Sequence, residues 1–337
     1  MVSTSLQNLW GRGCAFLGSD FAIMGGGMSW ISEHTLVAAL SNKGGFGTLA
    51  CGSMEPPLLR KEIQATKALT KKPFGVNLIT MHPSLEALVD VCVEENVSHI
   101  VFAGGLPPAP CLKKAKDGGA KVLCFAPTLA LGKKLVRMGT DALIIEGMEA
   151  GGHIGPVSTS VLAQEILPFL HDVPVFVAGG IGCGDMMVSY LAMGAAGVQL
   201  GTRFVCAEEC IAHPNFKQAF IRASARDAVP SVQLDERFLV IPVRALVNEG
   251  CKNFIKKQRD VIALFESGAL TREQAQLEIE QFWAGALRRA VIEGDIENGS
   301  VMAGQSVGMV KKIQPVADIF AEFIQQAENA LEEGKKI

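Results

Sequence analysis

The sequence predicts an α/β fold: a (β/α)8, or TIM, barrel with a smaller, mostly helical domain over the barrel mouth. Three features favour this fold. Eight short apolar runs have the length and composition of strands, helix-like segments separate most of them, and the units recur at roughly 25-residue spacing. An open, doubly wound parallel sheet is the alternative. Eight regularly spaced units favour the closed barrel.

The predicted strands and helices alternate along the first two thirds of the chain. The strands are residues 21–24, 46–51, 74–79, 99–103, 121–125, 142–146, 173–178 and 197–201. Helical periodicity occurs at residues 55–69, 84–95, 128–138, 159–170 and 185–193. Each of these helices is long enough to cross back over the sheet and start a parallel neighbour.

The alternation stops after the eighth strand, and this sets the domain boundaries. We assign residues 1–206 to the barrel, residues 207–300 to a smaller helical domain that covers the substrate, and residues 301–337 to a return segment and a terminal helix. Thr271 and Gln274 have the three-residue spacing of a capping box, which marks a helix start in the smaller domain. Residues 318–333 form an amphipathic helix that we expect to dock on the barrel.

Composition and charge limit the classes of partner. The 337 residues are 49% hydrophobic and 19% charged, with 31 Lys and Arg against 34 Asp and Glu. A formal net charge of −3 gives no general attraction to nucleic acid or to an anionic membrane. The apolar stretches are too short or too interrupted for a secretory signal or a membrane span, so we expect a soluble cytoplasmic protein. The nine scattered cysteines, with no CxxC pair, suit reduced thiols.

Two glycine-bearing loops follow the seventh and eighth predicted strands, where barrels of this kind hold a phosphate group. The first contains Gly179 and Gly180, and the second contains Gly201, Thr202 and Arg203. Glycine lets backbone N–H groups approach a phosphate, the Thr202 hydroxyl can donate, and Arg203 can add a charge. Tight turns of purely structural purpose are the alternative for either loop. Two such loops at the two expected places favour a phosphate site.

The loop after the sixth strand brings carboxylates and an imidazole to the catalytic face. It contains Glu146, Glu149 and His153, with glycines on either side of the histidine. An imidazole titrates near neutral pH and can give or take a proton beside a flat ligand. We therefore select His153 as the candidate catalytic residue over a structural loop histidine.

Other residues at the predicted mouth are candidates for ligand contact. Gly26 and Met28 lie in a glycine loop after the first strand, and Asn77 is an amide within an apolar strand that needs a partner from a ligand or the backbone. His82, after the third strand, could also reach the mouth. A helical face with Cys206, Cys210 and His213 could suggest zinc, but it has no fourth ligand and favours buried small residues, so we expect no metal.

These residues carry a resemblance to a known family. The chain resembles the FMN-dependent enoyl-acyl-carrier-protein reductases, which share a flavin-barrel superfamily with the nitronate monooxygenases, from about residue 21 to 333. Two stretches, 212–215 (Ala-His-Pro-Asn) and 299–305 (Gly-Ser-Val-Met-Ala-Gly-Gln), favour the reductase branch. Gly25 and residues 103–108 depart from the family pattern at the mouth. The stretches that carry the resemblance are 26–30, 72–77, 146–155, 178–181, 199–204, 212–215 and 299–305.

The resemblance implies a cofactor and roles for individual residues. FMN phosphate would lie on the loops of Gly179, Gly180, Gly201 and Thr202, and its ring near Gly26, Met28 and Asn77. Glu146 would hold the ribityl chain or ring edge, His153 would face the substrate, and Met302 and Gln305 would reach over from the smaller domain. The flavin supplies the redox step.

The resemblance also implies a reaction and partners. The expected activity is reduction of a trans-2-enoyl thioester by NADH or NADPH, with an acyl carrier protein as partner and a homodimer as the assembly. A nitronate monooxygenase that uses FMN and oxygen is the alternative, and a non-catalytic flavin-binding protein is a third. Candidate docking residues for an acidic carrier protein are Lys252, Lys256, Lys257, Arg288 and Arg289.

Overall fold

Eight parallel strands form the central sheet of the protein, as the sequence predicts. The structure is a computed structural model that describes residues 2–238 and 240–334, so the extreme ends of the first and last predicted segments lie outside the described residues. The strand order is β1-β9-β8-β6-β5-β4-β3-β2. The strands are β1 (Ile23–Gly25), β2 (Thr48–Ala50), β3 (Gly75–Ile79), β4 (His99–Ala103), β5 (Lys121–Phe125), β6 (Ala142–Glu146), β8 (Val175–Ala178) and β9 (Gly197–Leu200).

The sheet closes on itself between its first and second strands. Phe46, just before β2, bridges Met24 of β1 in parallel register. The Gly25 N–H donates to the Phe46 carbonyl at 2.7 Å, and the Phe46 N–H donates to the Ile23 carbonyl at 3.0 Å. This closure confirms the TIM barrel and excludes the open doubly wound sheet.

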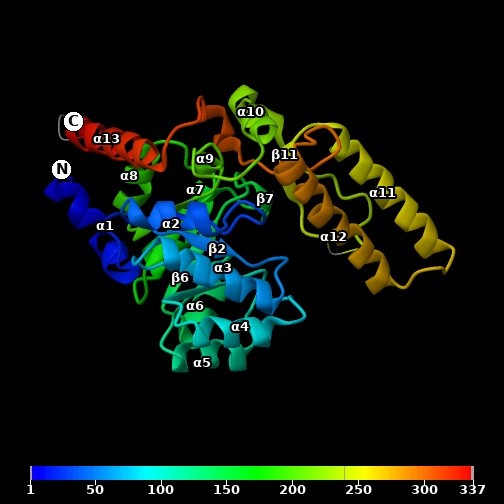
Figure 1. Ribbon diagram of the computed structural model, residues 1–337, viewed down its shortest axis with the longest axis horizontal. Coiled ribbons are helices and arrows are strands. Elements are labelled where there is room, and N and C mark those ends of the chain that lie inside the picture. The colour runs from blue at the N-terminus through cyan, green and yellow to red at the C-terminus, as the bar shows by residue number, and fades with distance from the viewer. Residues whose placement is uncertain (1, 239, 335–337) are drawn as a thin grey trace.

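Helices surround the barrel on its outer face (Figure 1). The five predicted barrel helices are present with ends shifted by a few residues, and α13 matches the predicted terminal helix. Helices α1 and α13 lie together at one side of the barrel, where the Ser3 N–H donates to Glu328 at 2.7 Å (Figure 1). The helices of the barrel and the terminus are α1 (Thr4–Leu17), α2 (His34–Asn42), α3 (Pro56–Leu69), α4 (Leu85–Glu94), α5 (Ala109–Asp117), α6 (Leu129–Arg137), α7 (Thr159–Ile166), the 3-10 turn η1 (Leu167–Phe169), α8 (Gly184–Ala192), α9 (Thr202–Val205) and α13 (Val316–Gly334).

Residues 207–300, called the cap segment below, contain helices and a small sheet. Strands β10 (Ala228–Pro230) and β11 (Val243–Leu246) pair antiparallel, and β11 also pairs with the two-residue strand β7 (Gly152–His153) of the loop after β6. The sequence analysis did not predict this sheet. Thr271 caps α12 in a capping box with Gln274, as predicted. The helical elements of this part are α10 (Pro214–Arg222), the 3-10 turn η2 (Ala225–Asp227), α11 (Glu249–Glu266), α12 (Arg272–Arg288) and the π-helical turn η3 (Arg289–Glu293), followed in the return segment by the 3-10 turn η4 (Gln305–Met309).

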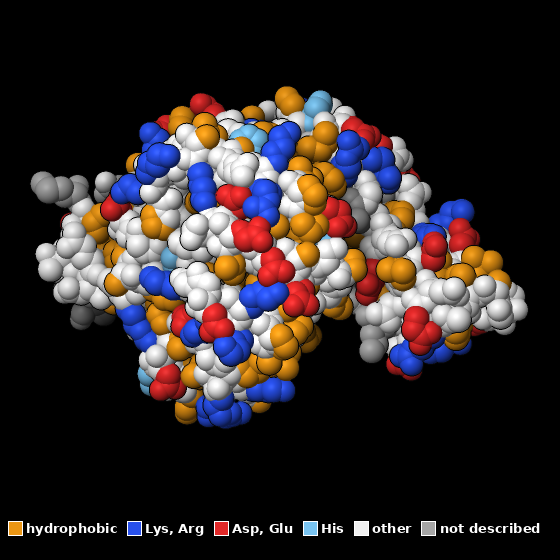
Figure 2. Space-filling view, turned by 60° about the horizontal axis from the view of Figure 1, so that its bottom comes forward, with side chains coloured by type: hydrophobic (Ala, Val, Ile, Leu, Met, Phe, Trp, Pro, Cys, Tyr) orange, Lys and Arg blue, Asp and Glu red, His pale blue; other side chains and the backbone are white. Residues whose placement is uncertain are grey.

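Helices α11 and α12 have an apolar core of their own. Phe254, Val261, Ile279 and Trp283 of these helices pack with Phe238 and Val243 of the connecting chain, in a cluster separate from the barrel cores. The helix pair stands away from the barrel in Figure 1, and a notch separates the two at the surface in Figure 2. The small sheet therefore links this projecting part of the cap segment to the barrel mouth.

Side chains alternate between two apolar cores along each barrel strand. Leu143, Ile145 and Val177 pack outward against the helices, whereas Ile144 and Phe176 belong to the cluster inside the barrel. The lower end of this inner cluster is filled by Leu17 and Phe16 at the end of α1. The barrel interior is therefore a packed core below its mouth, as in other barrels of this size.

All nine cysteines are free, in line with the predicted reduced thiols. No helix in the described part of the chain is long and apolar enough to cross a membrane.

His99 lies in the lower half of the barrel. Its buried imidazole makes the free energy of unfolding depend on pH in the acid range. Its Nε2 contacts the Phe16 carbonyl at 3.0 Å. Burial lowers the pKa of His99 to about 4, with the Phe16 carbonyl opposing the shift. In the unfolded chain the pKa returns to about 6.5. The unfolded state thus binds more protons between these two values, and the free energy of unfolding falls as the pH drops through that window.

We predict that protonation of His99 lowers the free energy of unfolding by about 3 kcal/mol when the pH falls from 7 to 4. The measurement is urea unfolding of the wild type and of His99→Gln at both pH values. The variant starts less stable at pH 7 but loses about 3 kcal/mol less on acidification. An equal loss in the two proteins would show that His99 does not supply this pH dependence.

Candidate functional site

Polar side chains end the apolar interior of the barrel at the C-terminal ends of its strands. Asn77 of β3, Glu146 of β6 and Gln199 of β9 alternate with outward-facing Val76, Ile145 and Val198, so they point inward. Glu146 and Gln199 both pair in register with Ala178, which places them on either side of it in one row. We call Asn77, Glu146 and Gln199 the polar row.

The polar row has no partner within the described chain. Asn77 and Gln199 are each only 7% exposed. Among the described residues, no hydrogen bond or ion pair involves the side-chain amides of Asn77 and Gln199 or the carboxyl group of Glu146. Buried amide groups normally find partners because an unmade hydrogen bond costs about 1–3 kcal/mol. The row is therefore suited to hydrogen-bond a ligand.

A raised pKa keeps the Glu146 carboxyl group mostly protonated at pH 7. Burial raises its pKa to about 8, because no nearby cation or donor offsets the desolvation of the carboxylate. A protonated carboxyl group can donate a hydrogen bond as well as accept one. Glu146 can thus hold a polar group of a ligand without placing a negative charge in the barrel mouth.

The glycine loop after β1 passes directly over two members of the polar row. A Cβ at Gly26 would lie 3.4 Å from Gln199 Nε2, and one at Gly27 would lie 2.6 Å from Asn77 Cβ. The loop is fixed by Ser32, whose hydroxyl donates to the Gly26 carbonyl at 2.7 Å and accepts from the Met28 N–H at 3.0 Å. The structure therefore places Gly26 next to Gln199 and Gly27 next to Asn77.

Gly179 and Gly180 form a turn that other residues cannot adopt without strain. Their φ angles are +90° and +73°. A Cβ at Gly179 would lie 2.9 Å from the Gly147 carbonyl oxygen, and one at Gly180 would lie 3.1 Å from Glu149 Cβ. In the described chain the N–H groups of Gly180 and Ile181 donate to no backbone carbonyl outside the regular elements. Free backbone donors at glycines are a suitable surface for a phosphate group.

The loops after β6 and β9 meet the return segment at the barrel mouth. The Gly304 N–H donates to Thr202 Oγ1 at 3.0 Å, and the Gln305 N–H donates to the Glu149 carbonyl at 2.9 Å. Met28 joins this group, since its Sδ would lie 3.4 Å from a Cβ at Gly201. The structure thus gathers five of the predicted site residues around the return segment and Glu149: Met28, Gly180, Gly201, Thr202 and Gln305.

His153 lies on the small sheet and not in the polar row. Strand β7 pairs His153 with Val243 of β11, and the side chain is exposed. Met302 lies next to the preceding residue of this strand, since a Cβ at Gly152 would lie 3.6 Å from Met302 Sδ. Partial desolvation by the surrounding protein lowers the pKa of His153, and the charge of Glu280 on α12 opposes that shift. The lowered pKa favours the neutral form of the ring, and the exposed side chain is open to a bound molecule.

The Glu149 side chain is hydrogen-bonded within the protein. Its carboxylate accepts from the N–H and the hydroxyl of Thr159 at the start of α7, both at 2.8 Å. This contact fixes the loop after β6 next to the glycine turn at Gly179, whose carbonyl oxygen lies 3.1 Å from Thr159 Oγ1. Glu149 is a support for the site and offers no free carboxylate to a ligand.

Arg203 does not add a charge to the phosphate loop, and that expectation was wrong. It is 4% exposed and its Nη2 lies 3.0 Å from Glu322 of α13. The side chain packs under the terminal helix, away from the loop surface.

Two other histidine expectations also have local explanations. His82 Nδ1 accepts from the Ser84 N–H at 3.1 Å, next to α4. His213 Nδ1 accepts from the Asn215 N–H at 3.1 Å and so caps α10, while the Cys206 thiol donates to the Lys217 carbonyl. Cys206, Cys210 and His213 do not converge as ligands; among the described residues the group with ligand-like spacing is Glu33, His34 and Glu62.

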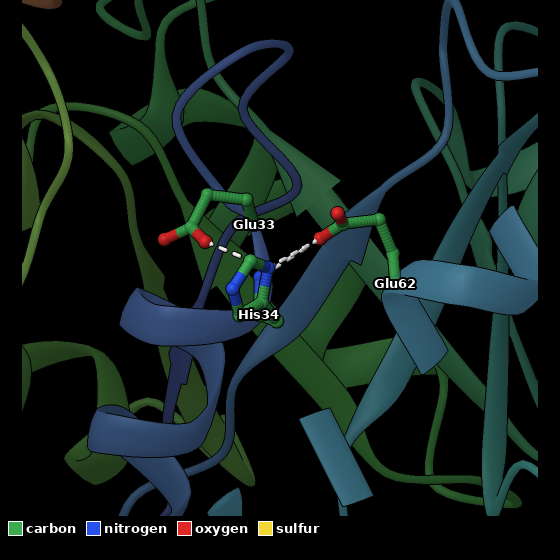
Figure 3. A group of neighbouring side chains, drawn as sticks. All are labelled: Glu33, His34 and Glu62. Atoms are coloured by element: carbon green, nitrogen blue, oxygen red, sulfur yellow. Dashed lines mark hydrogen bonds and ion pairs between the residues drawn. The ribbon is translucent and has the colours of Figure 1, made fainter. Parts of the chain in front are cut away.

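The group of Glu33, His34 and Glu62 serves the start of α2 (Figure 3). Glu33 accepts from the Thr35 and Leu36 N–H groups at 2.9 and 3.1 Å, and Glu62 accepts from the His34 N–H at 3.2 Å. His34 Nδ1 lies between the two carboxylates, 3.0 Å from Glu33 and 2.8 Å from Glu62. Glu33 and Glu62 therefore satisfy the first N–H groups of the helix, and the His34 ring lies between their carboxylates.

Most of the candidate docking cations are paired within the cap segment. Lys252, Lys256 and Lys257 contact Glu249, Asp260 and Glu278, respectively. Arg288 pairs with Glu293, and its guanidinium carbon also lies 5.8 Å from the centre of the Trp30 ring in the loop after β1. Arg289 has no ion pair within the described residues.

Gln199 is the site residue that the sequence analysis missed. The signal that identified Asn77, a polar side chain inside an apolar strand, is equally present at Gln199 in the run Gly197–Leu200. It was treated only as part of a motif.

Comparison with known proteins adds the family. The model of the nitronate monooxygenase family matches residues 13–89 and 85–326. A (3aS,4S,5R,7aS)-5-hydroxy-7a-methyl-1-oxo-octahydro-1H-indene-4-carboxyl-CoA dehydrogenase from Rhodococcus jostii is 29% identical, over 92% of this chain and 94% of its own. A nitronate monooxygenase from Paraburkholderia phytofirmans is 26% identical, over 94% and 95%.

Two solved structures have the same fold. FabK from Thermotoga maritima is 36% identical and superposes with a TM-score of 0.85, over 100% of this chain and 99% of that one. A nitroalkane oxidase from Streptomyces ansochromogenes, at 24% identity and a TM-score of 0.76, shares the fold over 94% of this chain and 98% of that one. The match of the family model over nearly the whole barrel and cap segment shows that this chain belongs to the nitronate monooxygenase family of oxidoreductases.

Proposed function

We propose that the protein is an FMN-dependent oxidoreductase that reduces trans-2-enoyl thioesters with NADH or NADPH. The observation that carries this proposal is the unpartnered polar row directly beneath a glycine-lined mouth. Asn77, Glu146 and Gln199 offer donors and acceptors at the mouth, and Gly180 and Ile181 offer free backbone N–H groups in the loop after β8. A flat heterocycle with a phosphate tail has the complementary groups.

The chemistry of these residues fits FMN. Gly179, Gly180, Gly201 and Thr202 would hold the phosphate, and the polar row with Gly26 and Met28 would hold the ring and the ribityl chain. A neutral Glu146 suits an uncharged ring edge better than a carboxylate would. When bound, FMN supplies the transfer of a hydride from the nicotinamide to the substrate.

A thioester substrate is supported by two relatives. The FabK likeness agrees with the resemblance of the motifs to enoyl-acyl-carrier-protein reductases, and the Rhodococcus relative is named for a CoA thioester. In the proposed reaction one hydride reaches Cβ of the enoyl group and one proton reaches Cα. His153 supplies or organises that proton, because its ring is open to a bound molecule at the mouth.

The proposal extends to the partners. The substrate would be carried by an acyl carrier protein or coenzyme A, and the enzyme would act as a cytoplasmic homodimer. Among the candidate docking cations, Arg289 has no ion pair within the described chain. It is therefore the first residue whose charge should be reversed when carrier docking is tested.

Nitronate oxidation is the alternative function. The family model and the Paraburkholderia relative both carry that name. The same site would then use oxygen as the electron acceptor and would need no nicotinamide.

An anaerobic assay separates the two functions. We expect purified enzyme to oxidise NADH or NADPH without oxygen only when an enoyl thioester such as crotonyl-CoA is present. Oxygen uptake with an alkyl nitronate is measured alongside. Nitronate-driven oxygen uptake without enoyl-dependent nicotinamide oxidation would replace the proposed function by the alternative.

Gly180→Val tests the phosphate loop. The added side chain would meet Glu149 and impose strain at a φ of +73°, so we predict that the purified variant retains less than about one tenth of the wild-type flavin. Flavin content is measured by absorbance after denaturation. Gly119→Val is the matched control, because Gly119 has a φ of +85° and no atom within 4 Å of its Cβ position. Full flavin in Gly180→Val would remove this loop from the site.

His153→Ala tests the proton donor. The variant should keep its flavin, because the phosphate loops lie on other strands, and should lose about 10²- to 10⁴-fold in kcat with the enoyl thioester. The wild-type pH–rate profile should contain a limb below pH 6.5, since the pKa of His153 is lowered, and the variant should lack that limb.

His171→Ala is the control for an exposed histidine that lies elsewhere and contacts the Pro168 carbonyl. A His153→Ala enzyme that keeps within about threefold of the wild-type kcat would assign the proton to solvent.

A further inference from the structure

A buried arginine in the cap segment has no acidic partner. Arg244 of β11 is 2% exposed. Its Nε donates to the Met148 carbonyl at 2.8 Å and its Nη1 donates to the Ala228 carbonyl at 2.5 Å. No carboxylate in the described chain lies within ion-pair distance of it. Burial lowers the pKa of Arg244, and the charge of Glu149 opposes that shift.

The position is costly for a cation. A buried charge without a counter-ion carries a penalty of several kcal/mol, so an apolar side chain would satisfy packing alone at lower cost. The two carbonyl groups come from different elements, Met148 from the loop after β6 and Ala228 from β10. A planar guanidinium can donate along two fixed directions at once, which a lysine ammonium on a flexible stem does not do.

The Arg244 side chain adds a second connection between the cap segment and the loop after β6, which the main chain already joins through β7 and β11. In the pairing of β11 with β7, Arg244 lies opposite Gly152 and Val243 lies opposite His153. The Ile154 N–H donates to the Pro242 carbonyl at 2.9 Å, which continues the contact. Arg244 thus holds the start of the loop at Met148, while its own strand holds the end of the loop at His153.

We propose that Arg244 is a positioning residue that fixes the loop of residues 148–153 to the cap segment and thereby sets the place of His153 over the barrel mouth. The consequence for His153 rests on the proposed function, whereas the attachment of the loop does not. Arg244 touches neither substrate nor cofactor in this role.

Hydrogen exchange tests the attachment without any assay of activity. In Arg244→Met we expect the amides of residues 148–154 to exchange at least about tenfold faster than in the wild type, with no change in the amides of β4. Arg244→Lys, which keeps the charge but lacks the fork, should give an intermediate rate. The control is Arg237→Met, since Arg237 also lies in the cap segment but pairs at the surface with Asp235 and Glu266. Unchanged exchange at 148–154 in Arg244→Met overturns the proposal.

Kinetics test the effect on His153. Arg244→Met should lower kcat with the enoyl thioester by about 10- to 100-fold, since small displacements of a reacting group are costly, and should change KM for the nicotinamide by less than about twofold. Arg244→Met combined with His153→Ala should be no slower than His153→Ala alone, because the arginine acts through the histidine.

The hydrogen-exchange and kinetic measurements together also distinguish failure of this proposal from failure of the proposed function. Additive losses in the double variant would overturn the positioning role. A wild-type enzyme without enoyl-dependent activity would overturn the proposed function, and the exchange measurement would still decide whether Arg244 attaches the loop.

Discussion

The central constraint in this molecule is that a closed barrel of eight strands has room inside only for side chains, and the last inward-facing positions are polar. Phe176, Ile144 and their neighbours fill the interior below. Asn77, Glu146 and Gln199 end that interior without partners of their own. Their donors and acceptors have no protein partner in the described chain and are available to a ligand. The glycine loops, the return segment and the cap segment are all arranged around this row.

The surrounding loops depend on one another through few side chains. Glu149 accepts from Thr159 at the start of α7, and its carbonyl accepts from Gln305, so a single residue holds the glycine turn, the loop after β6 and the return segment together. The cap segment adds the pairing of β7 with β11 and the two bonds of Arg244. His153, the residue proposed to move a proton, therefore lies in a loop of the barrel but is hydrogen-bonded to the cap segment.

Sequence reasoning succeeded where the pattern is local. Strand periodicity located β4, β5 and β6 at their observed ends, because apolar runs bounded by turns are read within a few residues. It failed at the small sheet, since β7 has two residues and its partner β11 lies about ninety residues further along the chain, a long-range pairing that carries no local signal. The environment of Arg203 was missed for the same reason. Its sequence neighbours predict a phosphate contact, but its side chain pairs with Glu322 of the distant helix α13. The raised pKa of Glu146 depends on burial, which the sequence alone does not state.

The claim that the polar row binds the flavin ring is tested most directly by calorimetric titration of FMN into flavin-free protein. The comparison is between the wild type and a variant with Asn77→Leu and Gln199→Leu, which keeps the barrel packed and removes two of the three groups. The account predicts one FMN per chain in the wild type and at least about tenfold weaker binding in the variant, since each lost hydrogen bond is worth roughly 1 kcal/mol. Equal affinity in the two proteins would contradict the account, because the row would then have no part in holding the flavin.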